Sequence, residues 1–149
     1  MIDGCEYREA MQVVKVDGGM GNNVVPNRAS ITINHRFAPD HSIAEATEVV
    51  RHVIGASVLG DDATFEVVDA SAGAQPSLGH PLLRQLASFV DAAPRAKLGW
   101  TDVAFFAAQG IPAVNFGPGD PTMAHTAGEF VTRELVEGCH AVLARFLGF

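Results

Sequence analysis

The sequence lacks several features that mark particular classes of protein. Its only cysteines, Cys5 and Cys139, lie at opposite ends of 149 residues, so they give no disulfide framework and both are expected to be reduced. It has no cluster of Lys or Arg, and its net charge of -7 argues against nucleic acid as a partner. No apolar run approaches the roughly 20 residues that cross a bilayer, and residues 1–8 contain no hydrophobic signal core. We therefore expect a soluble, cytoplasmic protein with no membrane partner.

The composition is that of a globular protein, and hydrophobic periodicity predicts its elements. With 48% hydrophobic residues, the chain could bury a sizeable core in one domain or two small ones. Before a linker at 71–79, the pattern predicts strands at 6–16, 28–37 and 63–70, and a helix from Ser42 to Gly55. After the linker it predicts helices at 81–93, 101–109 and 132–147, and strands at 95–99 and 111–116.

The two halves of this pattern suit different architectures. The first half suits a small α+β layer, and the second suits the edge of a larger α/β sheet with parallel strands. A three-stranded sheet with one helix buries little surface, and two parallel strands need further strands beside them and helices on their faces. We therefore expect residues of the same fold to precede Met1.

Histidine is the residue type in this sequence that most directly suggests chemistry. His35 falls on the apolar face of its predicted strand, which is typical of a core or interface histidine. Two others lie in predicted amphipathic helices, and two adjoin helix starts: His52, His140, His41 and His80. His125 differs because it follows a Gly/Pro-rich loop after a predicted strand, where α/β proteins usually bind ligands.

Several short segments, taken in order, resemble one known family. They are residues 2–5 with 7–9, Val16-Asp17-Gly18-Gly19, Asn23-Val24-Val25-Pro26, residues 34–40, Gly99-Trp100-Thr101-Asp102, and residues 115–121 with Ala124-His125. Together they resemble the M20 metallopeptidases, and within that family the branch of amide hydrolases that removes succinyl groups. A related deacylase is the alternative.

The resemblance implies a fold class and a division into domains. The family has a zinc-binding catalytic domain that is interrupted by a smaller lid domain, through which most members form homodimers. Residues 1–73 would be part of a small α+β, ferredoxin-like lid or dimerisation domain. Residues 74–149 would be the C-terminal part of the zinc-peptidase-like α/β catalytic domain.

The resemblance also implies a metal site to which this chain contributes one ligand. Family members bind two zinc ions per full-length subunit, with cobalt possible, and such metals lower the pKa of bound water towards roughly 7. His125 matches a ligand to one of them. The family's His-x-Asp pair, bridging Asp and Glu-Glu pair have no match here. The general base and the bridging carboxylate are therefore expected upstream, and this chain alone is expected to be inactive.

Five residues match substrate-binding positions of the family, and each has a plainer interpretation. Arg36 would pair with a substrate carboxylate, a task that suits the guanidinium fork, or be a solvated surface arginine. Asn23 would bond the substrate or satisfy a turn. Thr101, with Gly99 beside it, would receive a carboxylate or cap a helix. Asp120 would contact the substrate or form a turn. These roles imply a small-molecule substrate with several carboxylates.

One departure and one rival interpretation remain. After His125 the sequence reads Thr126-Ala127-Gly128-Glu129, where relatives often carry more charged residues, although Glu129 keeps its place four residues after the histidine. Because the chain lacks most of the ligands, it could also be a non-catalytic dimerisation module or the remnant of a broken gene.

Overall fold

The structure, a computed structural model, describes residues 1–55, 60, 62–97 and 99–149. Within them the chain divides into two compact units. The helical unit comprises Met1–Cys5, Ala74–Ala96 and Thr101–Phe149, and the hairpin unit comprises Glu6–Gly73 and Lys97–Trp100. The assignment of residues 1–73 to a lid and of 74–149 to a catalytic domain stays a prediction.

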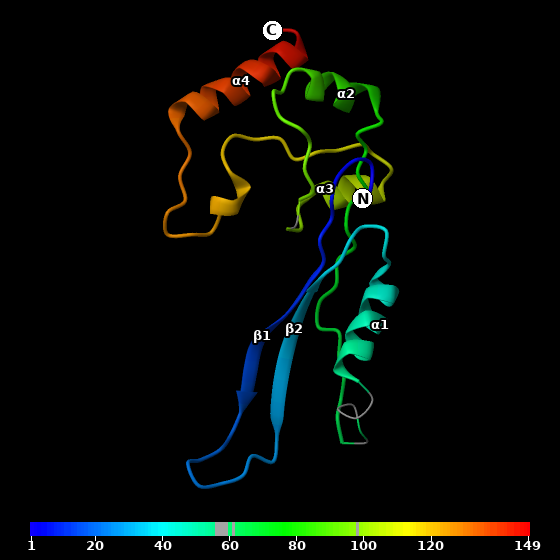
Figure 1. Ribbon diagram of the computed structural model, residues 1–149, viewed down its shortest axis with the longest axis vertical. Helices are drawn as coiled ribbons and strands as arrows, with labels where there is room; N and C mark the ends of the chain where they lie inside the picture. Colours follow the sequence, from blue (N-terminus) through cyan, green and yellow to red (C-terminus); the bar gives the residue numbers. More distant parts are fainter. Residues whose placement is uncertain (56–59, 61, 98) are drawn as a thin grey trace. The chain divides into compact units, whose positions relative to one another are not determined.

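The hairpin unit is built on two antiparallel strands, β1 (Ala10–Gly18) and β2 (Ala29–Arg36) (Figure 1). Ala10 pairs with Arg36 and Gly18 with Ala29, and the register shifts by one residue at Val14, which makes a β-bulge. The predicted strand at 28–37 is confirmed. The predicted strand at 6–16 begins later and ends later in the structure, because its pairing with β2 runs from Ala10 opposite Arg36 to Gly18 opposite Ala29.

The helix α1 (Ile43–Ile54) follows β2, as its sequence predicts. Ser42 and Glu45 form a capping box: the Glu45 backbone N–H donates to Ser42 Oγ at 3.2 Å, and the Ser42 N–H donates to Glu45 Oε2 at 2.8 Å. These bonds satisfy donors that a helix start leaves without partners. Gly55 ends the helix with a φ of 79°, a backbone conformation that costs glycine little.

Glu9 ties the start of β1 to the segment between β2 and α1. One oxygen, Oε1, accepts from the backbone N–H of Ala38 at 3.1 Å and lies 3.0 Å from His41 Nδ1. The other oxygen lies 3.8 Å from Nε2 of His35. His35 Nδ1 lies 3.2 Å from the carbonyl oxygen of Ala46 in α1, and the histidine side chain is 8% exposed. The interpretation of His35 as a satisfied, packed histidine is therefore confirmed.

The helical unit contains α2 (Pro81–Ser88), α3 (Val103–Ala108), the 3-10 helix η1 (Pro121–Met123) and α4 (Arg133–Leu147). The helices α2 and α4 contact each other, and the Arg145 guanidinium lies 4.3 Å above the Phe89 ring. The N-cap of α4 is Thr132, whose Oγ1 accepts from the Leu135 N–H at 3.4 Å. The predicted helix at 132–147 is confirmed, and the one at 81–93 ends earlier, at Ser88.

Three predicted strands are wrong. Residues 63–70 and 111–116 form no strand, and neither do the described residues of the segment 95–99, of which residue 98 lies outside the described part. A strand needs a hydrogen-bonded neighbour, and in the described chain β1 and β2 are the only strands, paired with each other. These apolar segments therefore lack the hydrogen-bonded neighbouring strand that a β-strand needs.

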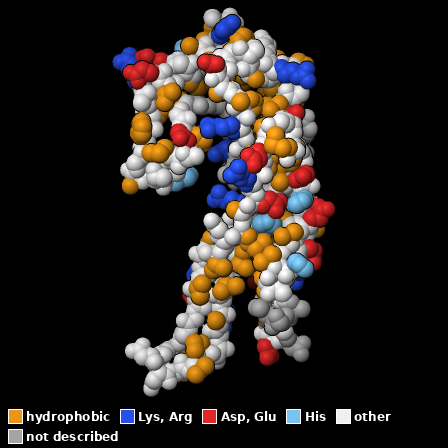
Figure 2. Space-filling view, viewed as in Figure 1, with side chains coloured by type: hydrophobic (Ala, Val, Ile, Leu, Met, Phe, Trp, Pro, Cys, Tyr) orange, Lys and Arg blue, Asp and Glu red, His pale blue; other side chains and the backbone are white. Residues whose placement is uncertain are grey.

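The expectation of a sizeable core is also wrong for the part of the chain that the structure describes. The buried apolar residues there are Cys5, Ala46 and Leu86, at 5%, 3% and 8% exposure. Many larger apolar side chains are exposed, and Figure 2 shows them gathered along the hairpin. Two strands and short helices offer too few opposing faces to enclose such side chains. No helix among the described residues is long and apolar enough to cross a membrane.

Candidate functional site

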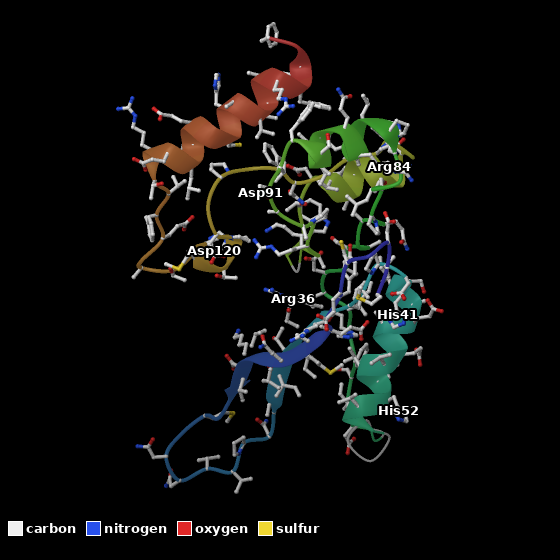
Figure 3. All side chains as sticks on the ribbon, turned by 45° about the horizontal axis from the view of Figure 1, so that its top comes forward. Arg36, His41, His52, Arg84, Asp91 and Asp120 are labelled. Carbon is white, nitrogen blue, oxygen red and sulfur yellow. The ribbon has the colours of Figure 1, made fainter. Side chains whose placement is uncertain are left out.

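The six residues proposed from the sequence are divided between the two units. Asn23, Arg36 and Gly99 belong to the hairpin unit, and Thr101, Asp120 and His125 belong to the helical unit. Figure 3 labels one from each: Arg36 at the end of β2, and Asp120 at the start of η1.

The loop that carries His125 is held by its own hydrogen bonds. His125 has a φ of 64°, in the left-handed region that residues other than glycine enter uncommonly and histidine more often than most. Its backbone N–H donates to Oε2 of Glu129 at 2.8 Å, and the Glu129 N–H donates to the Thr126 carbonyl at 3.1 Å. Thr126 Oγ1 in turn donates to the Met123 carbonyl at 2.7 Å. Glu129 therefore stabilises an unusual backbone conformation at the predicted metal ligand.

The described residues do not form a metal site by themselves. Among them, no group of three or more His, Cys, Asp or Glu side chains is arranged to hold an ion. A catalytic zinc normally takes about three protein ligands and a water, and His125 is one exposed imidazole. The side-chain chemistry of His125 suits zinc, but the described residues do not complete a site.

Asp120 is bound within its own turn. Its Oδ1 accepts from the Thr122 backbone N–H at 2.9 Å and from the Thr122 hydroxyl at 2.8 Å, which caps η1. The backbone hydrogen bond, then the hydroxyl, and to a smaller extent the charge of Arg95, lower the pKa of the Asp120 carboxyl. The turn-forming interpretation is thus realised for Oδ1, and a substrate contact would fall to the other oxygen.

Thr101 does not cap α3. The N-cap of this helix is Asp102, and it makes no side-chain capping bond. The Thr101 hydroxyl oxygen instead accepts a hydrogen bond from Asn115 Nδ2 at 3.1 Å. The N-cap interpretation of Thr101 is therefore wrong, and sequence reasoning gave Asn115 no role. A bond between side chains 14 positions apart has no local sequence signal.

Arg36 ends β2 with an exposed side chain. Three other arginines, Arg8, Arg51 and Arg133, lie within 3.5 Å of a carboxylate oxygen. In the described chain the guanidinium of Arg36 has no such carboxylate partner. Among the described residues no hydrogen bond uses its side chain either, so its donors are available there for a ligand, although exposure alone would also suit a solvated surface arginine.

Asn23 lies in the turn region that joins β1 to β2, and it is exposed. The turn is closed by a backbone bond from the Val24 N–H to the Gly21 carbonyl at 3.5 Å. Among the described residues no hydrogen bond uses the Asn23 side chain, so the turn does not depend on it. Gly99 lies in a bend, and a Cβ placed there would meet only the flexible end of Lys97, at 3.9 Å.

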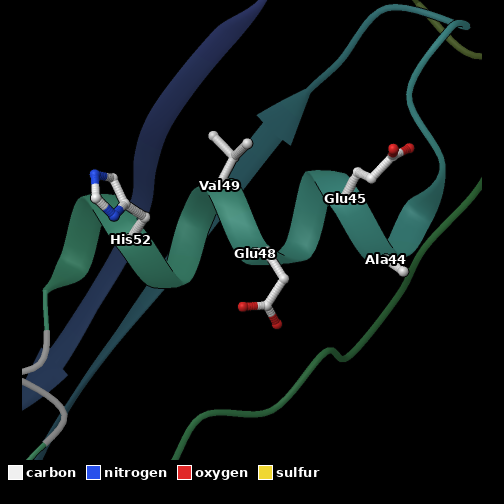
Figure 4. Close-up of a pocket in the computed structure, with 5 residues that line it drawn as sticks. All are labelled: Ala44, Glu45, Glu48, Val49 and His52. Carbon is white, nitrogen blue, oxygen red and sulfur yellow. The ribbon is translucent and has the colours of Figure 1, made fainter.

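One surface hollow is lined by none of these residues. It is a shallow groove of about 490 Å³ along α1, lined by Ala44, Glu45, Glu48, Val49 and His52 (Figure 4). Every lining residue comes from one exposed helix face. The groove contains none of the residues proposed from the sequence, and we assign it no role.

Comparison with known proteins gives relatives that match nearly the whole chain. It is 48% identical over 147 residues to a Mycobacterium tuberculosis protein whose name provisionally describes it as succinyl-diaminopimelate desuccinylase DapE, and 41% identical over 149 residues to the succinyl-diaminopimelate desuccinylase of Corynebacterium glutamicum. These alignments cover 99% and 98% of this chain but 40% of each relative. The acetylornithine deacetylase of Myxococcus xanthus is 29% identical over 133 residues, covering 87% of this chain and 35% of the relative.

A family model supports the same relationship along the chain. The model of peptidase family M20/M25/M40 matches residues 5–148, which includes all six residues proposed from the sequence. The chain therefore belongs to peptidase family M20/M25/M40.

Proposed function

We propose that residues 1–149 are one part of a succinyl-diaminopimelate desuccinylase. The complete enzyme would hydrolyse N-succinyl-LL-2,6-diaminopimelate with water to succinate and LL-2,6-diaminopimelate, a step towards diaminopimelate and lysine. The observation that carries the proposal is the similarity to desuccinylases, which runs along 98–99% of the chain at 41–48% identity. The acetylornithine deacetylase is a more distant relative at 29%.

The polar side chains of this chain suit the recognition of a substrate with several carboxylates. Arg36 offers a guanidinium with no carboxylate partner among the described residues, and a guanidinium can bind a carboxylate through two parallel hydrogen bonds. The Thr101 hydroxyl oxygen already accepts a bond from Asn115 and retains its own proton. Asn23 and Gly99 are the other two candidates for substrate binding. Asp120 would contact an amino or amide group of the substrate rather than a carboxylate, because like charges repel.

His125 would supply one ligand of a two-zinc site, with cobalt as a possible replacement. When bound, such ions activate a water molecule and polarise the amide carbonyl. The remaining ligands and the general base would come from residues outside these 149, since the chain spans 40% of the length of the desuccinylases that it matches. Glu129 would keep the backbone of His125 in its left-handed conformation.

The hairpin unit would form the partner surface. Exposed Val13, Val16 and Ile31 lie on the paired strands, and a hairpin with such side chains is suited to burial against another protein surface. We infer that the complete enzyme is a homodimer through a lid to which the hairpin unit belongs.

The test begins with the DNA that precedes the Met1 codon, translated in the same frame. We expect an open frame that contains His-x-Asp and Glu-Glu. The complete product should then contain zinc, sediment as a dimer, and hydrolyse N-succinyl-LL-2,6-diaminopimelate with a higher kcat/KM than N-acetylornithine.

Two outcomes would redirect the proposal. A higher kcat/KM for N-acetylornithine would place the complete protein among the deacetylases of the same family. A stop codon close upstream, with no matching coding sequence nearby, would leave a non-catalytic module or gene remnant and would remove the enzymatic function.

A further inference from the structure

The hydrogen bond that Asn115 donates to Thr101 determines which way the proton of the threonine hydroxyl can point. Asn115 Nδ2 lies 3.1 Å from Thr101 Oγ1, and the amide nitrogen can only donate. The threonine is half-buried and the asparagine is exposed. The same hydroxyl takes no part in capping α3, because the N-cap is Asp102. The contact is therefore the one defined partner of the Thr101 hydroxyl in the part of the chain that the structure describes.

A hydroxyl has one proton and two lone pairs. When an amide N–H occupies one lone pair, the proton of the hydroxyl points away from the amide and is available to a third partner, while one lone pair remains. An ionised carboxylate is a pure acceptor. The available proton therefore suits a carboxylate at Thr101, and asparagine maintains the arrangement because its amide does not titrate in the physiological range.

We propose that Asn115 is a positioning residue that orients the Thr101 hydroxyl to donate to a substrate carboxylate. This inference deepens the proposed function and rests on it. Asn115 would not touch the substrate. It would act through Thr101, so its loss should weaken substrate binding and leave the chemical step unchanged.

The test uses the complete gene product with two substitutions at position 115. Asn115→Asp keeps the size of the side chain but makes it an acceptor, so the Thr101 proton turns towards residue 115 and away from the substrate. We expect KM for N-succinyl-LL-2,6-diaminopimelate to rise about ten- to a hundredfold, because the lost bond is one to a charged group. Asn115→Ala removes the orienting bond alone and should raise KM about two- to tenfold. In both variants kcat should stay within about twofold.

Two controls separate orientation from general effects. Asn27→Asp makes the same change of charge at an exposed loop residue and should leave KM unchanged. In a Thr101→Val background, Asn115→Ala should raise KM no further, because Asn115 would act only through the hydroxyl. If Asn115 only stabilised the local structure, Asn115→Ala would raise KM to the same extent with or without Thr101→Val.

Each remaining outcome counts against a particular statement. An unchanged KM for Asn115→Asp would mean that the direction of the Thr101 proton does not affect substrate binding, and this overturns the inference while the desuccinylase activity stands. A fall in kcat at constant KM, or a full additional effect of Asn115→Ala beside Thr101→Val, overturns it too. If the unsubstituted protein does not hydrolyse the succinylated substrate, the proposed function fails first. The inference fails on its own if Thr101→Val then leaves the side-chain amide resonances of Asn115 unmoved.

Discussion

The described chain already uses some of the hydrogen-bond donors and acceptors of the candidate site residues and leaves others without a partner. Three residues illustrate this: Arg36, Thr101 and His125. The guanidinium of Arg36 has no carboxylate partner there, and the Thr101 hydroxyl accepts from Asn115 and keeps its proton. The imidazole of His125 is exposed, while its backbone N–H is bound by Glu129 at 2.8 Å. Under the proposed function, Arg36 and Thr101 would each donate to a substrate carboxylate, and the ring of His125 would bind a metal.

Replacement of Arg36 by alanine in the complete gene product should mainly weaken substrate binding. A charge-assisted bidentate pair is stronger than a neutral hydrogen bond, and a hydrogen bond to a charged group contributes about 1.5–3 kcal/mol, so we expect KM to rise about ten- to a hundredfold with little change in kcat. Steady-state kinetics with the succinylated substrate measure both constants.

Arg28→Ala is the matched control, because Arg28 is also exposed and directly precedes β2. It should leave KM unchanged. Equal effects of the two substitutions would show that the loss reflects the net charge of the hairpin unit. Arg36→Lys should recover only part of the affinity, since an ammonium group cannot form the two parallel bonds of a guanidinium.

At the scale of single residues, the sequence indicated which side chains to inspect but not which alternative each would adopt. Thr101 was predicted either to cap a helix or to contact a ligand. The helix cap is excluded because α3 begins one residue later than expected, with Asp102 as its N-cap. Asn115 had no predicted role because its bond to Thr101 depends on the path of the intervening 13 residues. His35 was predicted well, since its position on the apolar face of a strand already implied packing.

At the scale of elements, the helices with local start signals were predicted correctly. The strands that have no pairing partner in the described chain were predicted wrongly. The capping box of α1 and the threonine cap of α4 each lie within four residues of the sequence, so both helices begin where predicted. The predicted strands at 63–70 and 111–116 depend on neighbours that a hydrophobic run does not specify. The hairpin of β1 and β2 formed because both of its strands lie in one short stretch of chain.

The capping box of α1 should contribute measurably to helix stability. Ser42→Ala removes the hydroxyl that accepts from the Glu45 N–H, and such a loss costs about 1 kcal/mol. Urea unfolding followed by far-UV circular dichroism should show a lower midpoint than in the unsubstituted chain. Ser71→Ala, at an exposed residue outside the helices and strands, should leave the midpoint unchanged. An equal loss there would show that the effect does not come from the cap.

The same capping box should weaken in acid. The backbone N–H of Ser42, and then its hydroxyl, lower the pKa of Glu45 below its ordinary value of 4.5. Because the pKa is lower in the folded chain than in the unfolded one, the stabilisation is present above about 4.5 and is lost as the pH falls through the folded-state pKa. Glu45→Gln should therefore be less stable than the unsubstituted chain at neutral pH, with the difference shrinking as the pH falls below 4.5.

At the scale of the whole molecule, two observations have the same explanation under the proposed function. They are the exposed apolar surface and the incomplete set of metal ligands. Among the described residues three apolar side chains are buried, and no group of acidic, histidine or cysteine side chains can hold an ion. The chain also spans 40% of the length of its desuccinylase relatives. Under the proposed function, residues of the complete enzyme outside these 149 would cover the exposed apolar surface and would supply the further ligands beside His125.

Zinc binding by the 149-residue chain alone tests this explanation at the same scale. A single neutral imidazole supplies a small part of the roughly 10–16 kcal/mol that complete structural zinc sites provide, so titration calorimetry at neutral pH should detect no tight, stoichiometric zinc. His125→Ala should then leave the weak residual binding almost unchanged, and His52→Ala, which removes an exposed imidazole from α1, should behave in the same way. One tightly bound equivalent that disappears in His125→Ala and survives in His52→Ala would mean that this chain assembles a complete site by itself. The proposal that its companion ligands lie outside these 149 residues would then fall, whatever substrate the complete protein hydrolyses.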